Sequence, residues 1–432
     1  MPAAGGDIRP LIVRPGSDGR PVFSPDGKSL AFVSGGGVHD WLRENKLHIL
    51  DLGTGVIRNI GDSYDRTPET IGWSRDSRTI WFGGPLNSTS QLFRINPDGS
   101  ALANVSNIDG VMADAAIWNG SVVFAQQTLA TPPELYITEL TRFAPRQLTS
   151  VNSAFRARDM GETRRISWKN PQDGLQIDGF LTLPVGHKPG QRAPLLTFVH
   201  GGPASRFDQG YLGYLGFIYA PQVLASKGYA VFRPNPRGTG GYGEKFRRAN
   251  RNDWGGMDWN DINAGIDQII AQGVADPERL GIMGWSYGGF IAAWAIGHSD
   301  RFKAISIGAP IVDLLSMHGT TDIRDFVGHY FDGDAAAVEK RRAPLSLELL
   351  RAHSPMWQLK PTKAPVLIQH GENDERVPLS QGTMLYRALQ DLGVNVTMVV
   401  YPRSPHTPRE PKLRMDVAQR NLDFFMKHIP VK

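Results

Sequence analysis

A serine within a glycine-rich turn is the residue best placed for nucleophilic chemistry in this sequence. Residues 284–288 read GWSYG and match the G-x-S-x-G pattern of a nucleophile elbow around Ser286. The apolar run 280–283 before it is typical of a buried strand, and residues 290–296 after it are typical of a helix. A sharp strand-to-helix turn raises the serine hydroxyl above the sheet, and the glycines let chain segments pass close together. We therefore predict that Ser286 is a nucleophile.

The acid and the base that such a serine needs occur later in the chain, in the order of carboxylate and then histidine. Asp374 lies a few residues past the apolar run 366–368, where a buried strand would end. His406 lies in a proline-rich loop that follows the run 396–400. His428 falls in an amphipathic C-terminal stretch and is expected at the surface. The sequence therefore predicts that Asp374 and His406 complete a catalytic triad.

A second glycine-rich turn could bind the negative charge that develops during acyl transfer. Residues 200–203 read HGGP and end the apolar run 195–199. A backbone N–H of this turn, together with the N–H of Tyr287 after the nucleophile, would form an oxyanion hole. His200 itself is expected to be structural, because a lone histidine at a strand end is more often packed and hydrogen-bonded than catalytic.

Two other kinds of site are not expected. Residues 238–243 (GTGGYG) match G-x-G-x-x-G, but residues 234–237 separate them from the strand 229–232, whereas a dinucleotide site needs its first glycine in the turn that closes the strand. The sequence has no H-E-x-x-H motif and no cysteine, which excludes disulfides, thiolate zinc sites, iron–sulfur clusters and cysteine nucleophiles. We expect no cofactor and no metal.

The elements that must position these residues alternate strand and helix from about residue 194 onwards. Residues 380–392 place apolar side chains on one helical stripe, and a hairpin is expected between residues 165–168 and 177–183. Uninterrupted apolar runs suit parallel strands that are buried on both faces. These runs are 195–199, 229–232, 280–283, 304–307, 366–368 and 396–400. We predict an α/β domain over residues 161–432 with a mostly parallel, doubly wound sheet that binds ligands at the carboxyl ends of its strands.

The first 160 residues instead contain an internal repeat of short strands. A turn followed by an apolar run occurs at 23–33 and 73–82, and more weakly at 118–124. A second strand pattern accompanies it about every 45 residues, at 46–51, 91–96 and 134–139. A repeat of this length made of several strands predicts β-propeller blades. We therefore expect a partial, propeller-like domain of about three blades over residues 1–160, with exposed strand edges that self-association could cover.

Composition narrows the classes of partner. The chain has 432 residues, of which 41% are hydrophobic and 21% charged, and this balance supports sizeable cores. Its formal net charge of +5 is too slight to indicate nucleic-acid binding. No apolar run reaches the roughly 18 residues needed to span a bilayer, and the start lacks a signal-peptide pattern. We expect no nucleic-acid partner, no membrane association and a cytoplasmic location, while secretion after removal of a leader stays open.

Taken together, these motifs resemble the prolyl oligopeptidase family of serine peptidases. The resemblance is carried by GWSYGG at 284–289, NPRGTGGYG at 235–243, HGGP at 200–203, GENDERVP at 371–378 and the His406 loop. It implies an N-terminal β-propeller joined to a C-terminal α/β-hydrolase domain. Family members usually carry about seven blades, so the predicted three would be a departure and would put the usual restriction to short peptides in doubt.

The resemblance also implies roles for two further residues. The HGGP turn is similar to that of the acylaminoacyl-peptidase branch, which implies that Gly202 supplies an oxyanion donor. The position of Arg376, two residues after the aspartate, matches the family arginine that binds a substrate carbonyl; a surface ion pair is the alternative. The sequence lacks the Glu-Glu doublet with which dipeptidyl-peptidase relatives hold a free N-terminus, although two separated acids could replace it.

The expected function is therefore hydrolysis of peptide bonds in short or N-acylated peptides through an acyl-enzyme. Two alternatives stay open. The first is an esterase that uses the same triad. The second is a propeller-based binding protein whose hydrolase domain is inactive.

Overall fold

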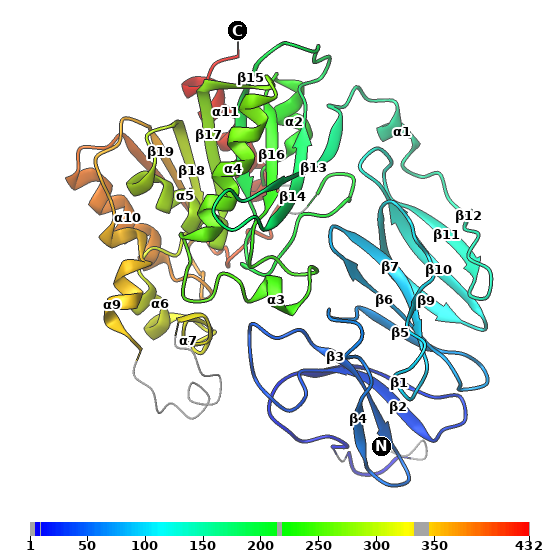
Figure 1. Cartoon of the computed structure of the whole chain (residues 1–432). Helices are drawn as coiled ribbons and strands as arrows, with labels where there is room; N and C mark the ends of the chain where they lie inside the picture. The colour runs from blue at the N-terminus through cyan, green and yellow to red at the C-terminus, as the bar shows by residue number, and fades with distance from the viewer. Residues whose placement is uncertain (1–4, 9, 214–217, 332–344, 432) are drawn as a thin grey trace.

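Two β-sheets, of four and eight strands, organise the N-terminal part of the described chain, and one sheet of eight strands organises the C-terminal part (Figure 1). The computed structural model describes residues 5–8, 10–213, 218–331 and 345–431. The N-terminal strands are β1 (Asp18–Phe23), β2 (Ser29–Ser34), β3 (Lys46–Asp51), β4 (Ile57–Asn59), β5 (Thr70–Trp73), β6 (Ile80–Leu86), β7 (Thr89–Ile95), β8 (Ala103–Asn104), β9 (Val111–Trp118), β10 (Ser121–Gln127), β11 (Glu134–Glu139) and β12 (Arg146–Gln147).

These strands form three antiparallel meanders of four strands each. The first sheet has the order β1-β2-β3-β4. The second sheet contains the meanders β5 to β8 and β9 to β12, which are joined where β7 runs parallel to β9. The predicted all-β, propeller-like fold is confirmed, and its three meanders correspond to the three predicted blades.

The same turn closes the first hairpin of two meanders, which explains the repeated sequence. The Ser24 hydroxyl donates to Asp26 at 2.6 Å, and the backbone N–H of residue 28 donates to the same carboxylate at 3.1 Å. Ser74 and Asp76 repeat these contacts at 2.6 and 3.1 Å. Short polar side chains that hydrogen-bond the backbone two residues on favour tight turns. The recurring motif is therefore a turn that precedes the second strand of the first two blades, β2 and β6.

The C-terminal sheet has eight strands in the order β13-β14-β16-β15-β17-β18-β19-β20. The pairs β13–β14 and β14–β16 are antiparallel, and every pair from β15–β16 to β19–β20 is parallel. The mostly parallel sheet predicted for this part is confirmed. Its strands are β13 (Thr163–Lys169), β14 (Gln176–Thr182), β15 (Ala193–Val199), β16 (Ala230–Asn235), β17 (Ala275–Trp285), β18 (Phe302–Gly308), β19 (Val366–Gly371) and β20 (Val396–Tyr401).

Alternate side chains of these strands enter two different cores, one on each face of the sheet. On β15, Leu195 belongs to one core and Leu196 to the other; both are fully buried. Helices α4 and α5 contribute to the first core, and helices α2 and α11 to the second. Burial on both faces explains why these strands read as continuous apolar runs rather than as alternating ones.

The longest helices are α4, α5, α10 and α11, with 15, 12, 13 and 18 residues. Residues 151–164 contain a four-residue helix and the first two residues of β13. The helices are α1 (Ser153–Arg156), α2 (Pro221–Ser226), α3 (Glu244–Arg247), α4 (Met257–Ala271), α5 (Tyr287–His298), α6 (Leu314–Thr320), α7 (Phe326–Phe331), α9 (Leu347–Ala352), α10 (Leu379–Asp391) and α11 (Pro411–His428).

Candidate active site

Ser286 occupies the single residue between the end of β17 and the start of α5. Its φ is +64°, in the left-handed region that non-glycine residues rarely adopt. The glycines around it are required by close packing. A Cβ on Gly288 would lie 2.1 Å from the carbonyl oxygen of Val199, and one on Gly284 would lie 2.3 Å from the carbonyl oxygen of Gly288. The serine therefore stands on a tight turn at the carboxyl edge of the sheet.

Asp374 and His406 come together although 32 residues separate them. Asp374 lies in the loop after β19, and its side chain is fully buried. The Nδ1 atom of His406, in the loop after β20, lies 2.7 Å from Oδ2 of Asp374. The indole of Trp285 donates to the His406 carbonyl at 2.8 Å and ties this loop to the nucleophile turn. This pairing leaves the other ring nitrogen of His406 available to a substrate or nucleophile.

The surroundings of Asp374 keep it ionised. Burial acts to raise the pKa of Asp374, but hydrogen bonds with His370 and His406 outweigh burial and hold the pKa at about 2. The backbone N–H of Val377 also donates to the carboxylate, at 2.9 Å. His370, at the end of β19, lies 3.4 Å from the carboxylate and 2.8 Å from the Val377 carbonyl. The carboxylate can therefore fix the imidazole of His406 and stabilise its protonated form.

The two proposed oxyanion donors belong to turns on neighbouring strands. Val199 of β15 is in register with Gly284 of β17, so the turns after both strands meet. Gly202 has a φ of +118°, and a Cβ there would lie 2.3 Å from the backbone nitrogen of Ala204, so only glycine fits. Tyr287 is the first residue of α5 and is fully buried.

His200 is a packed residue in this structure. It is buried between the Gly201 carbonyl, at 2.8 Å, and the Thr239 hydroxyl, at 3.0 Å. Burial lowers the pKa of His200 to about 4, which keeps the ring neutral. The imidazole can therefore serve the packing of the HGGP turn without carrying charge.

A cavity of about 330 Å³ opens beside the serine. Ser286, Gly202, His406 and Arg376 all line it, so the structure brings these predicted residues to one place. The guanidinium of Arg376 is paired with Asp322 through contacts of 2.7 and 3.1 Å. One wall of the cavity is apolar and is formed by Ile311, Met317, Ile323, Phe326 and Tyr330.

Sequence reasoning missed the part of the cavity wall that comes from the N-terminal half. Trp41, between β2 and β3, lines the cavity and makes an edge contact with Phe326 at 5.5 Å between ring centroids. Arg247 of α3 also lines it and donates to the Trp41 carbonyl at 2.6 Å. Arg248, the next residue, pairs with Asp40 at 2.5 Å. No local motif marks Trp41, because its role arises only from long-range packing.

Fold and site together define an α/β-hydrolase with a serine on its nucleophile elbow. The family model described as "Prolyl oligopeptidase family" matches residues 216–431. The chain belongs to the prolyl oligopeptidase family, and the resemblance inferred from its motifs is confirmed.

Individual relatives agree with this membership. Dipeptidyl-peptidase 5 of Porphyromonas gingivalis is 27% identical over 405 residues, which cover 92% of this chain and 57% of that protein. The uncharacterized peptidase YuxL of Bacillus subtilis is 30% identical over 367 residues, which cover 83% of this chain and 53% of that protein. The structure of Pyrococcus horikoshii acylaminoacyl peptidase matches with a TM-score of 0.81 at 28% identity, over 94% of this chain and 62% of that one. The chain thus spans about half the length of the curated relatives it matches.

The described residues hold neither a membrane-spanning helix nor a metal-binding cluster. None of the helices in this part of the chain combines the length and apolar character required to cross a bilayer. Within the same residues, no group of three or more histidine or acidic side chains is arranged to hold a metal ion.

Proposed function

We propose that this protein is a serine peptidase that hydrolyses short or N-acylated peptides through an acyl-enzyme. The observation that carries the proposal is the 2.7 Å contact between Asp374 and His406, with the imidazole and Ser286 lining one cavity. An oriented imidazole beside a serine is the arrangement that activates a hydroxyl for acyl transfer. We further propose that residues 161–432 form the catalytic domain and residues 1–160 the propeller-like domain.

In this mechanism the Ser286 hydroxyl oxygen attacks the scissile carbonyl carbon while His406 takes the hydroxyl proton. The N–H groups of Gly202 and Tyr287 donate to the oxyanion of the tetrahedral intermediate. The intermediate collapses as the C–N bond breaks and His406 gives its proton to the leaving amine. Water, activated by the same imidazole, then cleaves the acyl-enzyme ester and restores the serine. Asp374 stays ionised throughout and supports the transient imidazolium.

The cavity suits an apolar side chain next to the scissile bond. Its wall of aliphatic and aromatic residues would be removed from water when such a side chain binds, which favours binding by about 25 cal/mol per Å² of apolar surface. Arg376, held in place by Asp322, would donate to a backbone carbonyl of the substrate. An N-acetylated phenylalanine amide combines these features and is the substrate class to test first.

The test compares three chromogenic substrates at equal concentration: N-acetyl-phenylalanine p-nitroanilide, phenylalanine p-nitroanilide and an N-acetyl-phenylalanine ester. We expect the acetylated anilide to be hydrolysed, and the Ser286→Ala variant to be inactive and unlabelled by a fluorophosphonate probe. Hydrolysis of the ester alone would indicate that the protein is an esterase and would contradict the peptidase proposal. A folded wild-type protein that neither turns over nor takes the probe would indicate a binding protein with an inactive hydrolase domain.

A further inference from the structure

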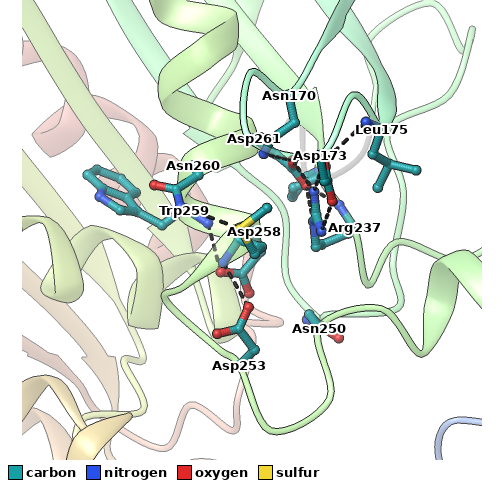
Figure 2. Close-up of polar contacts among 12 residues, drawn as sticks. Asn170, Asp173, Leu175, Arg237, Asn250, Asp253, Asp258, Trp259, Asn260 and Asp261 are labelled. Carbon is teal, nitrogen blue, oxygen red and sulfur yellow. Dashed lines mark hydrogen bonds and ion pairs between the residues drawn. The ribbon is translucent and has the colours of Figure 1, made fainter.

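Helix α4 carries two fully buried aspartates one turn apart, Asp258 and Asp261, and within the described part of the chain only Asp261 is paired with a cation. Asp261 is held by the guanidinium of Arg237 through two contacts of 2.9 Å and by the amide of Asn170 at 2.6 Å. Figure 2 shows Asp261 against Arg237, and Asp258 apart from that pair and next to Asp253. Among the described residues, no arginine, lysine or histidine forms an ion pair with Asp258. A buried carboxylate without a cation is costly, so its other contacts deserve an explanation.

Those contacts lead directly to the nucleophile turn. One oxygen of Asp258 accepts from the backbone N–H groups of Gly255, at 2.8 Å, and Trp259, at 2.7 Å. The other oxygen accepts from the phenol of Tyr287 in a short hydrogen bond. The amide of Asn250 approaches the same phenol oxygen at 3.4 Å. The tyrosine hydroxyl is thus the side-chain partner through which Asp258 reaches the active site.

The ring of Tyr287 is held on its faces as well as at its tip. The ring of Trp254 makes an edge contact at 5.0 Å between centroids, and Phe290 stacks on it at 5.7 Å. Tyr287 directly follows Ser286, so its backbone N–H lies in the left-handed turn that carries the nucleophile. A shift of the ring would therefore move the peptide group that we propose as an oxyanion donor.

We propose that Asp258 is a positioning residue for the oxyanion hole: by binding the Tyr287 phenol it fixes the orientation of the Tyr287 backbone N–H. This role rests on the peptidase function proposed above. It assigns a task to a buried acid that the triad does not use. Asp258 acts through Tyr287 and does not touch the substrate. Its contribution should therefore appear in stabilisation of the tetrahedral intermediate and not in binding of the ground-state substrate.

The experiment compares Asp258→Asn and Tyr287→Phe with a matched control, Asp267→Asn. Asp267 lies on the same helix, but its side chain is 64% exposed and pairs with Arg301 at the surface. Loss of a whole oxyanion donor lowers the rate by about 10²–10³-fold. A mispositioned donor still stabilises the oxyanion in part, so a smaller loss is expected. For N-acetyl-phenylalanine p-nitroanilide we expect kcat to fall about tenfold in both variants, with KM changed less than twofold and the control unchanged.

A second readout separates positioning from general loss of structure. N-acetyl-phenylalaninal forms a hemiacetal with Ser286 that places an oxygen in the hole, so its inhibition constant should rise about tenfold in parallel with the fall in kcat. The double variant should lose no more than either single variant, because both remove the same contact. Thermal unfolding identifies a variant that does not fold. If Asp258→Asn does not fold, the result for Tyr287→Phe, which keeps the aromatic ring, decides whether the positioning role holds.

The outcomes are distinct. Wild-type kcat and aldehyde affinity in Tyr287→Phe would overturn the positioning role while leaving the peptidase proposal intact. A rise in KM as large as the rise in the aldehyde inhibition constant would also overturn the positioning role, because it would indicate general damage to the cavity. A wild-type protein that shows no Ser286-dependent hydrolysis would overturn the proposed function first, and the positioning role with it.

Discussion

Two buried carboxylates reach Ser286 through different neighbours, and their surroundings differ sharply. Asp374 supports the imidazole side of the serine through His406, and Asp258 supports the oxyanion side through Tyr287. The pKa of Asp374 is held at about 2, because hydrogen bonds with two histidines outweigh its burial. Burial raises the pKa of Asp258 to about 7. The hydrogen bond from Tyr287 only partly opposes this rise, and the negative charge of Asp253 increases it further.

The comparison shows that burial alone does not decide whether a carboxylate is charged. Both side chains are shielded from water, but within the described residues only Asp374 contacts side chains that can carry a positive charge, His370 and His406. The difference matches the chemistry proposed for each side. The imidazole becomes positively charged during the reaction and needs an anion beside it, whereas the tyrosine stays neutral and needs only an acceptor. Three predictions can sharpen or break this contrast.

The largest effect is expected for Asp374→Asn. An amide in this position would no longer stabilise the imidazolium and would favour the wrong tautomer of His406, so kcat should fall about 10³–10⁴-fold. Steady-state kinetics on the acetylated anilide measure this loss, and circular dichroism checks the fold. Asp416→Asn, at an exposed ion pair on α11, is a matched control that should retain full activity. Near-normal turnover in Asp374→Asn would contradict the role of Asp374 in supporting His406.

A smaller loss is expected for Gly202→Ala on the oxyanion side. The added Cβ would lie 2.3 Å from a backbone nitrogen at a φ of +118°, so the turn must shift and its donor must move. We expect kcat to fall about 10²-fold, as for loss of one oxyanion donor. Gly186→Ala provides the control, because Gly186 also has a positive φ but no atom crowds its Cβ position. Equal activity of the two variants would contradict an oxyanion role for Gly202.

The smallest effects concern stability against pH, where the two acids should act in opposite directions. Asp374, with its pKa lowered from 3.8 to about 2, stabilises the fold by about 2 kcal/mol above pH 4, and this stability is lost as the pH falls toward 2. Asp258, with its pKa raised, keeps a proton in the fold that the unfolded chain has lost, so its contribution falls as the pH rises from about 4 to 7. Chemical denaturation between about pH 2 and 8 should show each slope flattened by the corresponding Asp→Asn change. A slope that neither variant alters would contradict the assigned pKa shifts.

The catalytic half was predictable wherever one local segment determines both the element and the role. The apolar runs, the turn around Ser286 and the loop positions of Asp374 and His406 follow from strand ends at one edge of a parallel sheet. Asp258 was not predictable in this way. Residues 257–261 (MDWND) contain two similar aspartates, and only their distant partners, Arg237 and Tyr287, distinguish them.

The N-terminal half shows the same limit. Its repeated turns predicted strands and blades, because hydrogen bonds such as that from Ser24 to Asp26 are local. The contribution of Trp41 to the cavity depends on where a loop between two strands packs against α7, about 285 residues later in the chain. Tertiary packing of this kind leaves no periodic signal in the sequence.

The position of Trp41 has an evolutionary consequence. The groups proposed to make and break bonds lie on the α/β sheet, whereas part of the wall that meets the substrate is encoded more than 200 residues earlier, on an N-terminal loop. Mutations in that loop can reshape the cavity without disturbing the Asp374–His406 pair. Selectivity and reactivity can therefore diverge independently, and the loop around Trp41 is the natural place to engineer new preferences while the reaction centre is left untouched.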